Sequence, residues 1–422
     1  MPGTGKTSLI SFLVRLLIAH GKRVLVTSYT HSAVDTVLLK LVEKGVHNTS
    51  DHRRLPAVAR IGQKAACHPA IHQLLVSETA IQVELDLNPD VVMPSSESLK
   101  HSMRAARVVG ITALSLARSP LLAGEHFDFV IVDEAGQISQ PAVIGALKAA
   151  DRFVMVGDHM QLPPLVSSDL ALRGGYGVSL FKQLADTHEG SLQRLTLQYR
   201  MHQDICDLCN RLVYNGKLKC GSDEVRLGTL SLPEYPRGLR STPADMTWLE
   251  RALDPLSPAV FVDTDSFSDD VGNLESKSGG HTGQNVVNHV EARLTKSLAE
   301  GLVSCGAETV DIGVICPYRA QLGLLNECAT LKCLKDRGLE MSTIDRYQGR
   351  DKKIILVSLV RSNESGRVGR LLQDRRRLNV AFSRAKNKLI VLGSRSTMEK
   401  GSDALKDIIC SLDEKGRIVN KC

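Results

Sequence analysis

A continuous apolar run that ends in two acids constrains the fold of this chain more than any other stretch. It lies in FDFVIVDEAGQ, residues 127–137, and leads directly into Asp133 and Glu134. Short β-branched apolar runs are typical of strands buried on both faces, as in parallel sheets. Ligands bind at the carboxyl ends of such strands, where two acids can hold a metal ion and orient a water molecule. The alternative is an ordinary acidic loop after a core strand.

Length and composition favour two or three packed domains. The chain has 422 residues, of which 43% are hydrophobic, and it contains no run of eighteen apolar residues, so we expect no membrane partner. A formal charge of +7 suits a polyanionic partner without requiring one. The ten scattered cysteines favour a reducing compartment over a disulfide scaffold. Cys206 and Cys209 have a metal-like spacing, but no second pair follows, so no zinc site is expected.

The first residues contain most of a phosphate-binding loop. The stretch PGTGKT, residues 2–7, precedes an apolar-periodic helix, and its glycines let backbone N–H groups wrap phosphates. Lys6 is placed to reach the β- and γ-phosphates, and the Thr7 hydroxyl is placed to bind Mg²⁺. The leading glycine and the strand of the full pattern would fall before Met1. We therefore expect the first strand of this domain to be missing.

Further strands and polar loops complete the pattern of one α/β domain. A strand at 24–27 leads into SYTHSAVD, a hydroxyl-rich loop that can bind nucleic-acid phosphates or can simply cap a helix. A strand at 152–156 leads into GDHMQLPP, where Gln161 is an uncharged group able to sense a γ-phosphate. This order predicts a RecA-like nucleotide-binding domain over residues 1–190, with a helical insertion at about 45–105.

The second half predicts another α/β domain, over residues 191–422. It opens with LTLQYRM, and an arginine such as Arg200, brought from a second domain, can stabilise transition-state charge on a phosphate. Prolines and glycines predict a loop-rich insertion at about 219–290, interrupted by a strand at 259–262 and by a helix that begins at 285. Near the end, a basic helix is expected at 375–386, with Arg384 on one of its faces.

The ordered set of motifs resembles superfamily 1 helicases of the 5′-to-3′ branch. The stretches that carry this resemblance are GTGKT, SYTHSAVD, VDEAGQ, GDHMQLPP, LQYRM, TIDRYQGRDKK, LVRSN and LNVAFSRAK. Within that branch the chain looks most like the helicase half of the DNA replication ATP-dependent helicase/nuclease family, and the nonsense-mediated-decay RNA helicases are the relatives to exclude. The resemblance implies two RecA-like P-loop NTPase domains, α/β in class, each with a parallel sheet flanked by helices.

The resemblance also implies roles for individual residues. The implied catalytic residues are Lys6, Asp133, Glu134, Gln161, Arg200 and Arg384. The implied ATP-binding residues are Gly3, Thr4, Gly5, Lys6, Thr7, Tyr199, which would stack on adenine, and Asp351, which would hold the ribose. The implied Mg²⁺ ligands are Thr7 and Asp133. The implied nucleic-acid contacts are Thr30, His31, Thr112, Thr343 and Tyr347.

The function implied by the resemblance is an ATP-dependent helicase or translocase that acts on single-stranded or forked DNA in replication and repair, as a fragment of a helicase/nuclease. ATP and Mg²⁺ are the implied cofactors, replication or repair proteins are candidate partners, and the nucleus is the expected location, with the mitochondrion as the alternative. The family's nuclease module precedes the phosphate loop, so this chain is not expected to cut DNA. The rival functions are an RNA helicase and a nucleic-acid-binding module that does not hydrolyse ATP.

Overall fold

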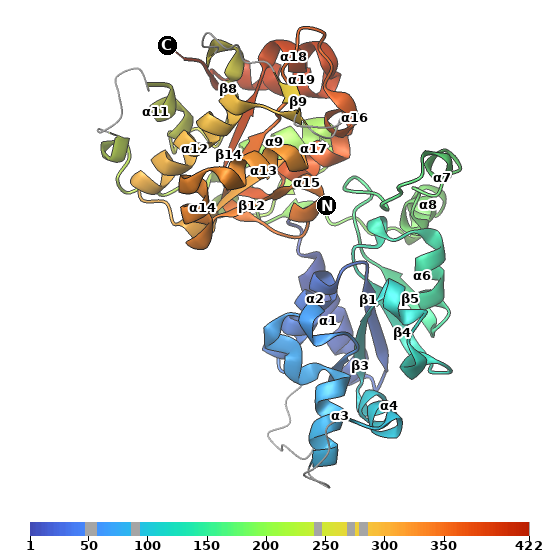
Figure 1. Ribbon diagram of the computed structural model, residues 1–422. Coiled ribbons are helices and arrows are strands. Elements are labelled where there is room, and N and C mark those ends of the chain that lie inside the picture. The colour runs from blue at the N-terminus through green and yellow to red at the C-terminus, as the bar shows by residue number, and fades with distance from the viewer. Residues whose placement is uncertain (47–56, 86–92, 240–246, 268–274, 278–285, 422) are drawn as a thin grey trace. The chain divides into compact units, whose positions relative to one another are not determined.

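The computed structural model describes residues 1–46, 57–85, 93–239, 247–267, 275–277 and 286–421 (Figure 1). The chain divides into two compact units. The N-unit comprises Gly5–Arg194, and the C-unit comprises Leu195–Cys422 together with Met1–Thr4. The change of unit after Arg194 lies close to the predicted boundary at 190. The first four residues, however, group with the C-unit, so the phosphate-binding loop is divided between the units.

The N-unit is built on a parallel five-stranded sheet with the strand order β2-β3-β1-β4-β5. The strands are β1 (Val24–Ser28), β2 (Val58–Arg60), β3 (Val108–Thr112), β4 (Phe127–Val132) and β5 (Ala150–Met155). Successive side chains of a strand point to opposite faces, so β4 contributes to two cores. Ile131 packs in the core on the side of α1 and α2, whereas Val130 and Val132 pack in the core that includes α6. The prediction that this apolar run is buried on both faces is confirmed.

Helices cover both faces of this sheet (Figure 1). They are α1 (Lys6–Ala19), α2 (His31–Glu43), α3 (Val76–Leu85), α4 (Ser96–Ala105), α5 (Ala113–Leu116), α6 (Gln140–Leu147), α7 (Asp169–Arg173) and α8 (Leu180–Thr187). In the described part of the chain α1 is the first element, and β5 forms an edge of the sheet. Consequently Phe153 of β5 is 49% exposed. The stretch predicted as a helical insertion also contributes β2, which the sequence analysis did not predict.

The C-unit is built on a parallel six-stranded sheet with the strand order β12-β11-β13-β14-β8-β15. Its strands are β8 (Ala259–Asp263), β11 (Ile312–Cys316), β12 (Glu340–Thr343), β13 (Lys352–Ser358), β14 (Ala385–Gly393) and β15 (Ile418–Val419). Two short pairs accompany it, namely β6 (Leu197–Gln198) with β7 (Lys219–Cys220), and β9 (Ser276–Lys277) with β10 (Val286–Val287). Because β8 lies inside the main sheet, the prediction that 219–290 is an insertion is wrong for this strand.

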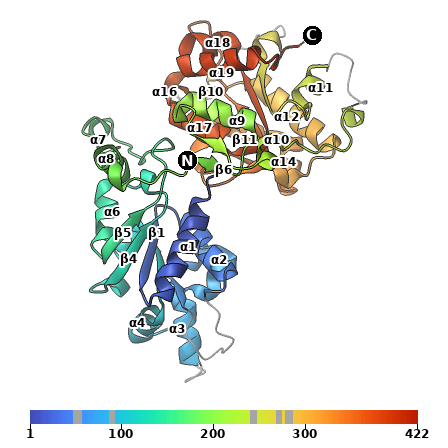
Figure 2. The same ribbon diagram turned by 180° about the vertical axis from the view of Figure 1, so that it is seen from behind.

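The helices of the C-unit also lie on both sides of its sheet. They are α9 (Gln203–Cys209), α10 (Asp223–Leu227), α11 (Thr247–Leu253), α12 (His289–Ser304), α13 (Arg319–Glu327), α14 (Ala329–Asp336), α15 (Ile344–Tyr347), α16 (Gly369–Gln373), α17 (Arg375–Phe382), α18 (Arg395–Gly401) and α19 (Asp403–Asp413). One core joins α11, α12 and α14 to the sheet. Figure 2 shows α9, α17 and α19 from the other side. Since α17 ends at Phe382, Arg384 lies before β14 and not in the predicted helix.

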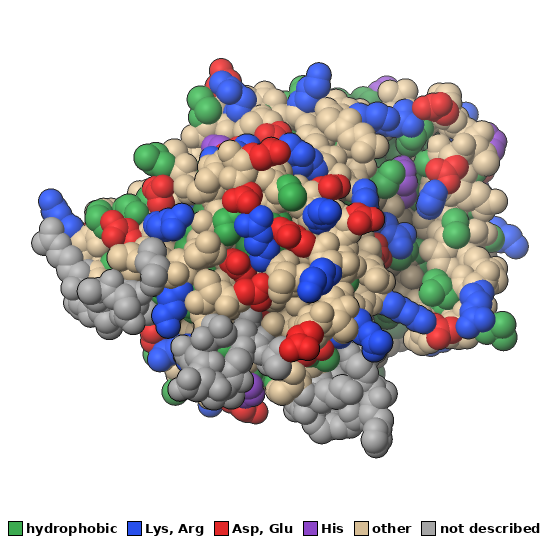
Figure 3. Space-filling model, turned by 90° about the horizontal axis from the view of Figure 1, so that it is seen from above, with side chains coloured by type: hydrophobic (Ala, Val, Ile, Leu, Met, Phe, Trp, Pro, Cys, Tyr) green, Lys and Arg blue, Asp and Glu red, His purple; other side chains and the backbone are tan. Residues whose placement is uncertain are grey.

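The surface gives no evidence of a single large charged field on the face shown in Figure 3, where Lys and Arg side chains are interspersed with Asp and Glu. Of the helices that the structure describes, none is both long enough and apolar enough to cross a membrane.

A fully buried acid in the C-unit, Glu291 of α12, holds the turn after β13. Its carboxylate accepts hydrogen bonds from the Ser358 hydroxyl at 2.6 Å and from the backbone N–H of Val360 at 3.0 and 2.8 Å. Val360 has a φ of 73°, which is strongly unfavourable for a β-branched residue, so these bonds stabilise a strained backbone. Burial raises the pKa of Glu291 to about 8, against the lowering effect of these hydrogen bonds.

This raised pKa predicts a pH-dependent stability. Between about pH 5 and pH 8 the folded protein keeps a proton on Glu291 that the unfolded chain has lost, so the free energy of unfolding falls as pH rises. The slope from one such group is at most about 1.4 kcal/mol per pH unit. We expect Glu291→Gln to remove the contribution of this group to the slope. The free energy of unfolding is measured in urea by the fluorescence of Trp248, the single tryptophan, which is buried in the core that joins α11, α12 and α14 to the sheet. A glutamine variant with the wild-type slope would contradict this assignment.

Candidate functional site

The phosphate-binding loop enters α1 through a glycine that only glycine suits well. Gly5 has a φ of 79° and caps the helix, and its carbonyl accepts the N–H of Leu9 at 2.9 Å. Lys6 and Thr7 are the first two residues of α1. The N-terminus of a helix favours anions through its free N–H groups and its dipole. The N-unit thus presents a lysine, a hydroxyl and backbone donors at one helix start.

The acid pair lies at the carboxyl end of β4, as predicted. Asp133 is 6% exposed, and its backbone N–H donates to the Thr27 carbonyl of β1 at 2.8 Å. Its carboxylate accepts the N–H of Glu134 at 2.9 Å. Glu134 has a φ of 50°, which is rare for a residue other than glycine, and Gln137 donates to its carboxylate at 3.2 Å. Strained backbone of this kind clusters at functional sites.

The electrostatics connect the acid pair to the phosphate loop. Burial, and secondarily the charge of Glu134, raise the pKa of Asp133 to about 7, while the N–H of Glu134 and the charge of Lys6 act in the opposite direction. Lys6 is therefore close enough to influence Asp133, and the structure brings these three predicted residues together within the N-unit.

The residues of this site fit a bound Mg²⁺ ion. A buried carboxylate beside a second carboxylate has an excess of negative charge that a cation would offset, and Thr7 adds a hydroxyl oxygen. Mg²⁺ prefers oxygen ligands and usually takes one or two carboxylates together with substrate phosphates. The described residues contain no cluster of three or more His, Cys, Asp or Glu that could hold a metal ion by themselves.

Gln161 is held beneath the loop that follows β5. It is 3% exposed, and its side-chain amide donates to the Asp158 carboxylate at 2.8 Å. The preceding turn packs tightly on the acid-pair loop, because a Cβ atom on Gly157 would lie 3.0 Å from the backbone nitrogen of Gly136. Asp158 was not predicted as a functional residue, although its position three residues before Gln161 in GDHMQLPP was visible.

The predicted nucleic-acid contacts of the N-unit differ in how accessible they are. Thr30 is exposed, and its hydroxyl caps α2 by accepting the N–H of Ala33 at 3.3 Å. This is the capping role that the sequence left open, and it does not exclude a phosphate contact. Thr112, at the end of β3, is 3% exposed and donates its hydroxyl to Ser115 at 2.8 Å. Thr112 is thus the less accessible of the two.

His31 belongs to a buried polar group that the sequence analysis missed. Its Nδ1 lies 3.1 Å from Nη2 of Arg60, and the Nε of Arg60 donates to the Asp35 carboxylate at 2.8 Å. Burial, and then the charge of Arg60, lower the pKa of His31, so the ring is neutral at pH 7 and can accept this hydrogen bond. Arg60 lies in β2, the short strand that was not predicted, so no sequence signal linked it to His31.

In the C-unit, Asp351 gathers two cations. Its carboxylate accepts Nη2 of Arg200 at 2.8 Å and Nζ of Lys386 at 2.8 Å. Burial alone would raise the pKa of Asp351, but Arg200, Lys386 and Arg384 together hold it below its ordinary value. Arg200 also donates to the Ser383 carbonyl at 3.2 Å. The structure therefore brings together three residues predicted for the nucleotide and adds Lys386, which was not predicted.

Arg384 is positioned by adjacent parallel strands. The residues that open β13 and β14 are paired in the sheet, so the loops before them, which hold Asp351 and Arg384, meet at one edge. Arg384 is 2% exposed, and its guanidinium donates to the carbonyls of Val380 at 3.0 Å and Arg350 at 3.2 Å. In this conformation Arg384 braces the loop that holds Asp351, and Arg200 is the more accessible arginine.

Tyr199 offers an exposed aromatic ring next in sequence to Arg200, which pairs with Asp351. Its side chain is 57% exposed, and its ring lies against Gly221, where a Cβ atom would be 2.3 Å from a ring carbon. Its backbone N–H donates to the Gly3 carbonyl at 2.8 Å. Gly3 has a φ of 68°, and a Cβ atom there would meet Arg200 at 2.7 Å. Gly3 and Thr4 are thus ordered on the C-unit next to Arg200, whereas Lys6 belongs to the N-unit.

The two remaining predicted contacts, Thr343 and Tyr347, are buried. Thr343, at the end of β12, is 9% exposed. Tyr347 is 0% exposed, and its hydroxyl occupies the space where a side chain on Gly313 would lie. This burial argues against a direct contact of Tyr347 with a nucleic-acid strand. Burial raises the pKa of the Tyr347 hydroxyl, and this hydroxyl has no hydrogen-bond partner in the described structure.

The fold and these residues define the class of P-loop nucleoside triphosphatases with α/β units. Residues 176–396 match the family model described as an AAA domain, and residues 1–88 and 86–169 match a second model of that description. The chain belongs to the AAA domain family.

Comparison with curated proteins confirms the predicted resemblance. The chain is 40% identical over 427 residues to the DNA replication ATP-dependent helicase/nuclease DNA2 of Saccharomyces cerevisiae, covering 100% of this chain and 26% of that protein. It is 42% identical over 406 residues to the Mus musculus protein of the same name, covering 95% of this chain and 35% of that protein. The chain thus spans about a quarter to a third of these relatives. A solved Arterivirus nonstructural protein 10 (helicase) with DNA is 16% identical with a TM-score of 0.44 and covers 97% of this chain and 61% of that one, too weak a likeness to carry an argument.

Proposed function

We propose that this chain is an ATP-driven helicase or translocase that acts on single-stranded DNA in replication and repair. The observation that carries the proposal is the acid pair of Asp133, which is buried, and Glu134, near Lys6 in the N-unit, combined with the group of Arg200, Asp351 and Lys386 in the C-unit. The first set has the chemistry to position ATP and a water molecule, and the second has the chemistry to stabilise charge on a phosphate. The sequence identity to helicase/nucleases named for DNA replication favours DNA over RNA as the nucleic-acid substrate.

The mechanism follows from these groups. Lys6 and the N–H groups at the start of α1 hold the β- and γ-phosphates of ATP. Thr7 and Asp133 would hold Mg²⁺, which when bound neutralises phosphate oxygens. Glu134 orients the attacking water and accepts its proton.

The C-unit supplies the remaining contacts in this proposal. Arg200 stabilises the charge that develops on the γ-phosphate. Arg384 braces the loop that holds Asp351, the ion-pair partner of Arg200. Tyr199 stacks on adenine, and Asp351 holds the ribose. Hydrolysis therefore requires residues of both units.

The finer parts of the proposal are single-stranded or forked DNA as substrate, Mg²⁺ as the metal, replication or repair proteins as partners, and the nucleus as the location. RNA is the competing substrate, because single-strand contacts to backbone and stacked bases serve both nucleic acids. The test is ATP turnover with oligo(dT) and with oligo(U) of equal length, at matched salt. Greater stimulation by the DNA strand supports the proposal, and greater stimulation by RNA would replace it with an RNA helicase.

A second candidate is a nucleic-acid-binding module without hydrolysis. It is favoured by the grouping of Gly3 and Thr4 with the C-unit, whereas Lys6 belongs to the N-unit, and by the exposure of Phe153 on the edge strand β5. The same assay separates the two candidates. Strand binding with no ATP turnover at any strand concentration would establish the binding module.

The buried pair of Gln161 and Asp158 predicts a coupling defect. Asp158→Ala removes a carboxylate that accepts the Gln161 amide at 2.8 Å, so the amide is held less firmly. We expect strand-stimulated turnover to fall by up to about 100-fold, since small displacements of positioning groups have effects of that order. Strand-free turnover should change much less, so the ratio of the two rates is the informative quantity. An unchanged ratio in Asp158→Ala would show that this pair does not couple the strand to hydrolysis.

A further inference from the structure

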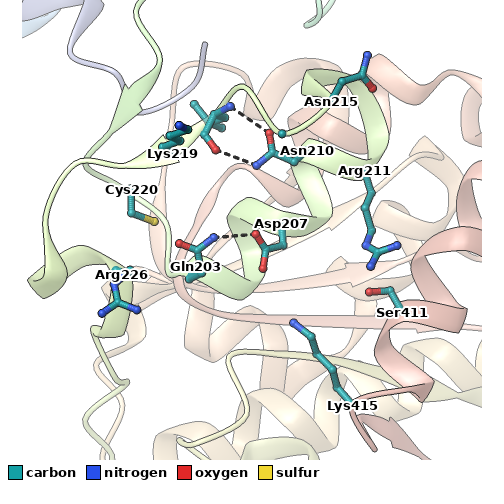
Figure 4. A pocket seen from close by; sticks show the side chains of 12 residues that line it. Gln203, Asp207, Asn210, Arg211, Asn215, Lys219, Cys220, Arg226, Ser411 and Lys415 are labelled. Atoms are coloured by element: carbon teal, nitrogen blue, oxygen red, sulfur yellow. Dashed lines mark hydrogen bonds between the residues drawn. The ribbon is translucent and has the colours of Figure 1, made fainter.

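The C-unit carries a basic hollow that is separate from the residues discussed above. It has a volume of about 800 Å³ and is bordered by α9, the turn that follows it, β7, α10 and the end of α19 (Figure 4). Its charged lining residues are Arg211, Lys219, Arg226, Lys415 and Asp207. No residue of the group around Asp351 lines it. The hollow thus has four cations and one carboxylate, contributed by separate elements.

The single carboxylate of the hollow is already engaged. Its oxygen accepts the Gln203 amide at 2.7 Å, and this pair lies in the middle of the lining in Figure 4. Two of the cations also have partners, because Lys415 pairs with Asp204 at 2.7 Å and Arg226 pairs with Asp223 at 2.8 Å. These pairs fix two positive groups at the border of the hollow without filling it.

The other two cations, Arg211 and Lys219, have no ion-pair partner among the residues that the structure describes. Arg211 and Lys219 are exposed, and neither side chain makes a hydrogen bond or ion pair with the part of the chain that the structure describes. A site with two free cations and two fixed ones has an excess of positive charge that an anionic ligand would offset.

The backbone holds Arg211 at this border through an uncommon turn. Asn210–Tyr214 forms a π-helical turn, a conformation that is rare and often found at functional sites. Asn215 then has a φ of 51°. The Asn210 side chain closes the loop by donating to the Leu218 carbonyl at 2.8 Å and accepting its N–H at 3.1 Å. The hydroxyl of Tyr214 accepts the amide of Asn379 at 2.8 Å, which ties the turn to α17.

The lining also restricts the class of ligand. Only Leu218 and Cys220 are apolar, and Leu218 is 1% exposed, so the hollow lacks the apolar anchor sites that dominate protein interfaces. No aromatic side chain lines it, so it offers no platform on which a base could stack. Guanidinium, ammonium and amide donors remain, and these are the groups that contact phosphates in nucleic-acid complexes.

We propose that this hollow binds the phosphate backbone of a nucleic-acid strand without reading its bases. The inference rests on the proposed function, since it gives the same strand an additional contact on the C-unit. Because such contacts release counterions, they determine how steeply strand affinity depends on salt. Each phosphate contact contributes about 0.7 to the slope of log affinity against log salt for single strands.

The test is the double variant Arg211→Gln with Lys219→Gln in the full chain. Binding of a fluorescent oligo(dT) is measured by anisotropy over a range of salt concentrations. We expect the slope to decrease by about 1.4, two phosphate contacts in all, and strand-free ATP turnover to remain as in the wild type. The matched control is Lys332→Gln with Arg337→Gln, which removes the same two charges from exposed positions in α14 and just after it. The control slope should equal the wild-type slope.

The outcomes are distinguishable. The inference is overturned if the double variant Arg211→Gln with Lys219→Gln keeps the wild-type slope. It is also overturned if the control variant loses as much slope as this double variant. Either result leaves the proposed function intact. Loss of binding to fluorescent polyglutamate with an unchanged DNA slope also overturns it, and identifies the hollow as a site for an acidic protein segment. A wild-type protein that binds no strand at any salt concentration contradicts the proposed function itself.

Discussion

Glu134→Gln is expected to reduce strand-stimulated ATP turnover by about 10²- to 10⁴-fold, the range typical of a lost general base. The amide has the shape of the carboxylate but cannot accept a proton from water at neutral pH. The substitution also keeps the hydrogen-bond capacity toward Gln137, which donates to Glu134 at 3.2 Å, so the loop should keep its conformation. Turnover is measured as phosphate release with saturating oligo(dT).

Two observations make this first prediction specific. Affinity for a fluorescent ATP analogue should stay close to that of the wild type, because Lys6 and the start of α1 are unaltered. The matched control is Glu189→Gln, which removes an exposed carboxylate from the same unit and should leave turnover unchanged. Near-normal turnover in Glu134→Gln would remove this residue from the mechanism.

Arg200→Ala is expected to reduce kcat by about 10³- to 10⁵-fold, the effect of losing an arginine that stabilises phosphoryl-transfer charge. Because the arginine acts in the transition state, KM for ATP should change little. Arg200→Lys should recover only part of the rate, since an ammonium group cannot replace a planar guanidinium that bonds both Asp351 at 2.8 Å and the Ser383 carbonyl at 3.2 Å.

The second prediction has controls of its own. Arg194→Ala removes an exposed arginine that pairs with Glu189 at 3.0 Å, an interaction that stabilises the fold by no more than about 1 kcal/mol. It should turn over ATP like the wild type. Asp351→Asn should raise KM more than it lowers kcat if this carboxylate holds the ribose. A change in KM alone for Arg200→Ala would assign the arginine to nucleotide binding and not to the chemical step.

The parts of the fold that sequence reasoning predicted well are those that depend on local patterns. The apolar run before Asp133 is continuous, rich in β-branched residues and followed by two acids. Eleven neighbouring residues were therefore enough to predict the strand, its burial and the position of the acid pair at its end. Gly5 and Lys6 were equally clear, because a helix with an apolar period follows them directly.

The parts that were missed depend on contacts between distant residues. The strand predicted at 259–262 is present as β8, but its place in the main sheet was not predicted, because nearby prolines indicated a loop-rich insertion. β2 is too short for a pattern to indicate it. Tyr347 was expected at a surface, but Gly313 leaves room for its ring in the core. Only the pairing of β13 with β14 shows that Arg384 and Asp351 meet, and the ion pair of Lys386 with Asp351 follows from the same pairing.

We propose that Glu134 of the N-unit and Arg200 of the C-unit act on the same ATP molecule in the same step. The most direct test is strand-stimulated ATP turnover in the two single variants and in the double variant Glu134→Gln with Arg200→Ala. Groups that act as a unit in one transition state are strongly non-additive, so the double variant should be about as slow as the slower single variant. A double variant slower by the full product of the two single effects would contradict the account, because it would mean that the two residues act independently.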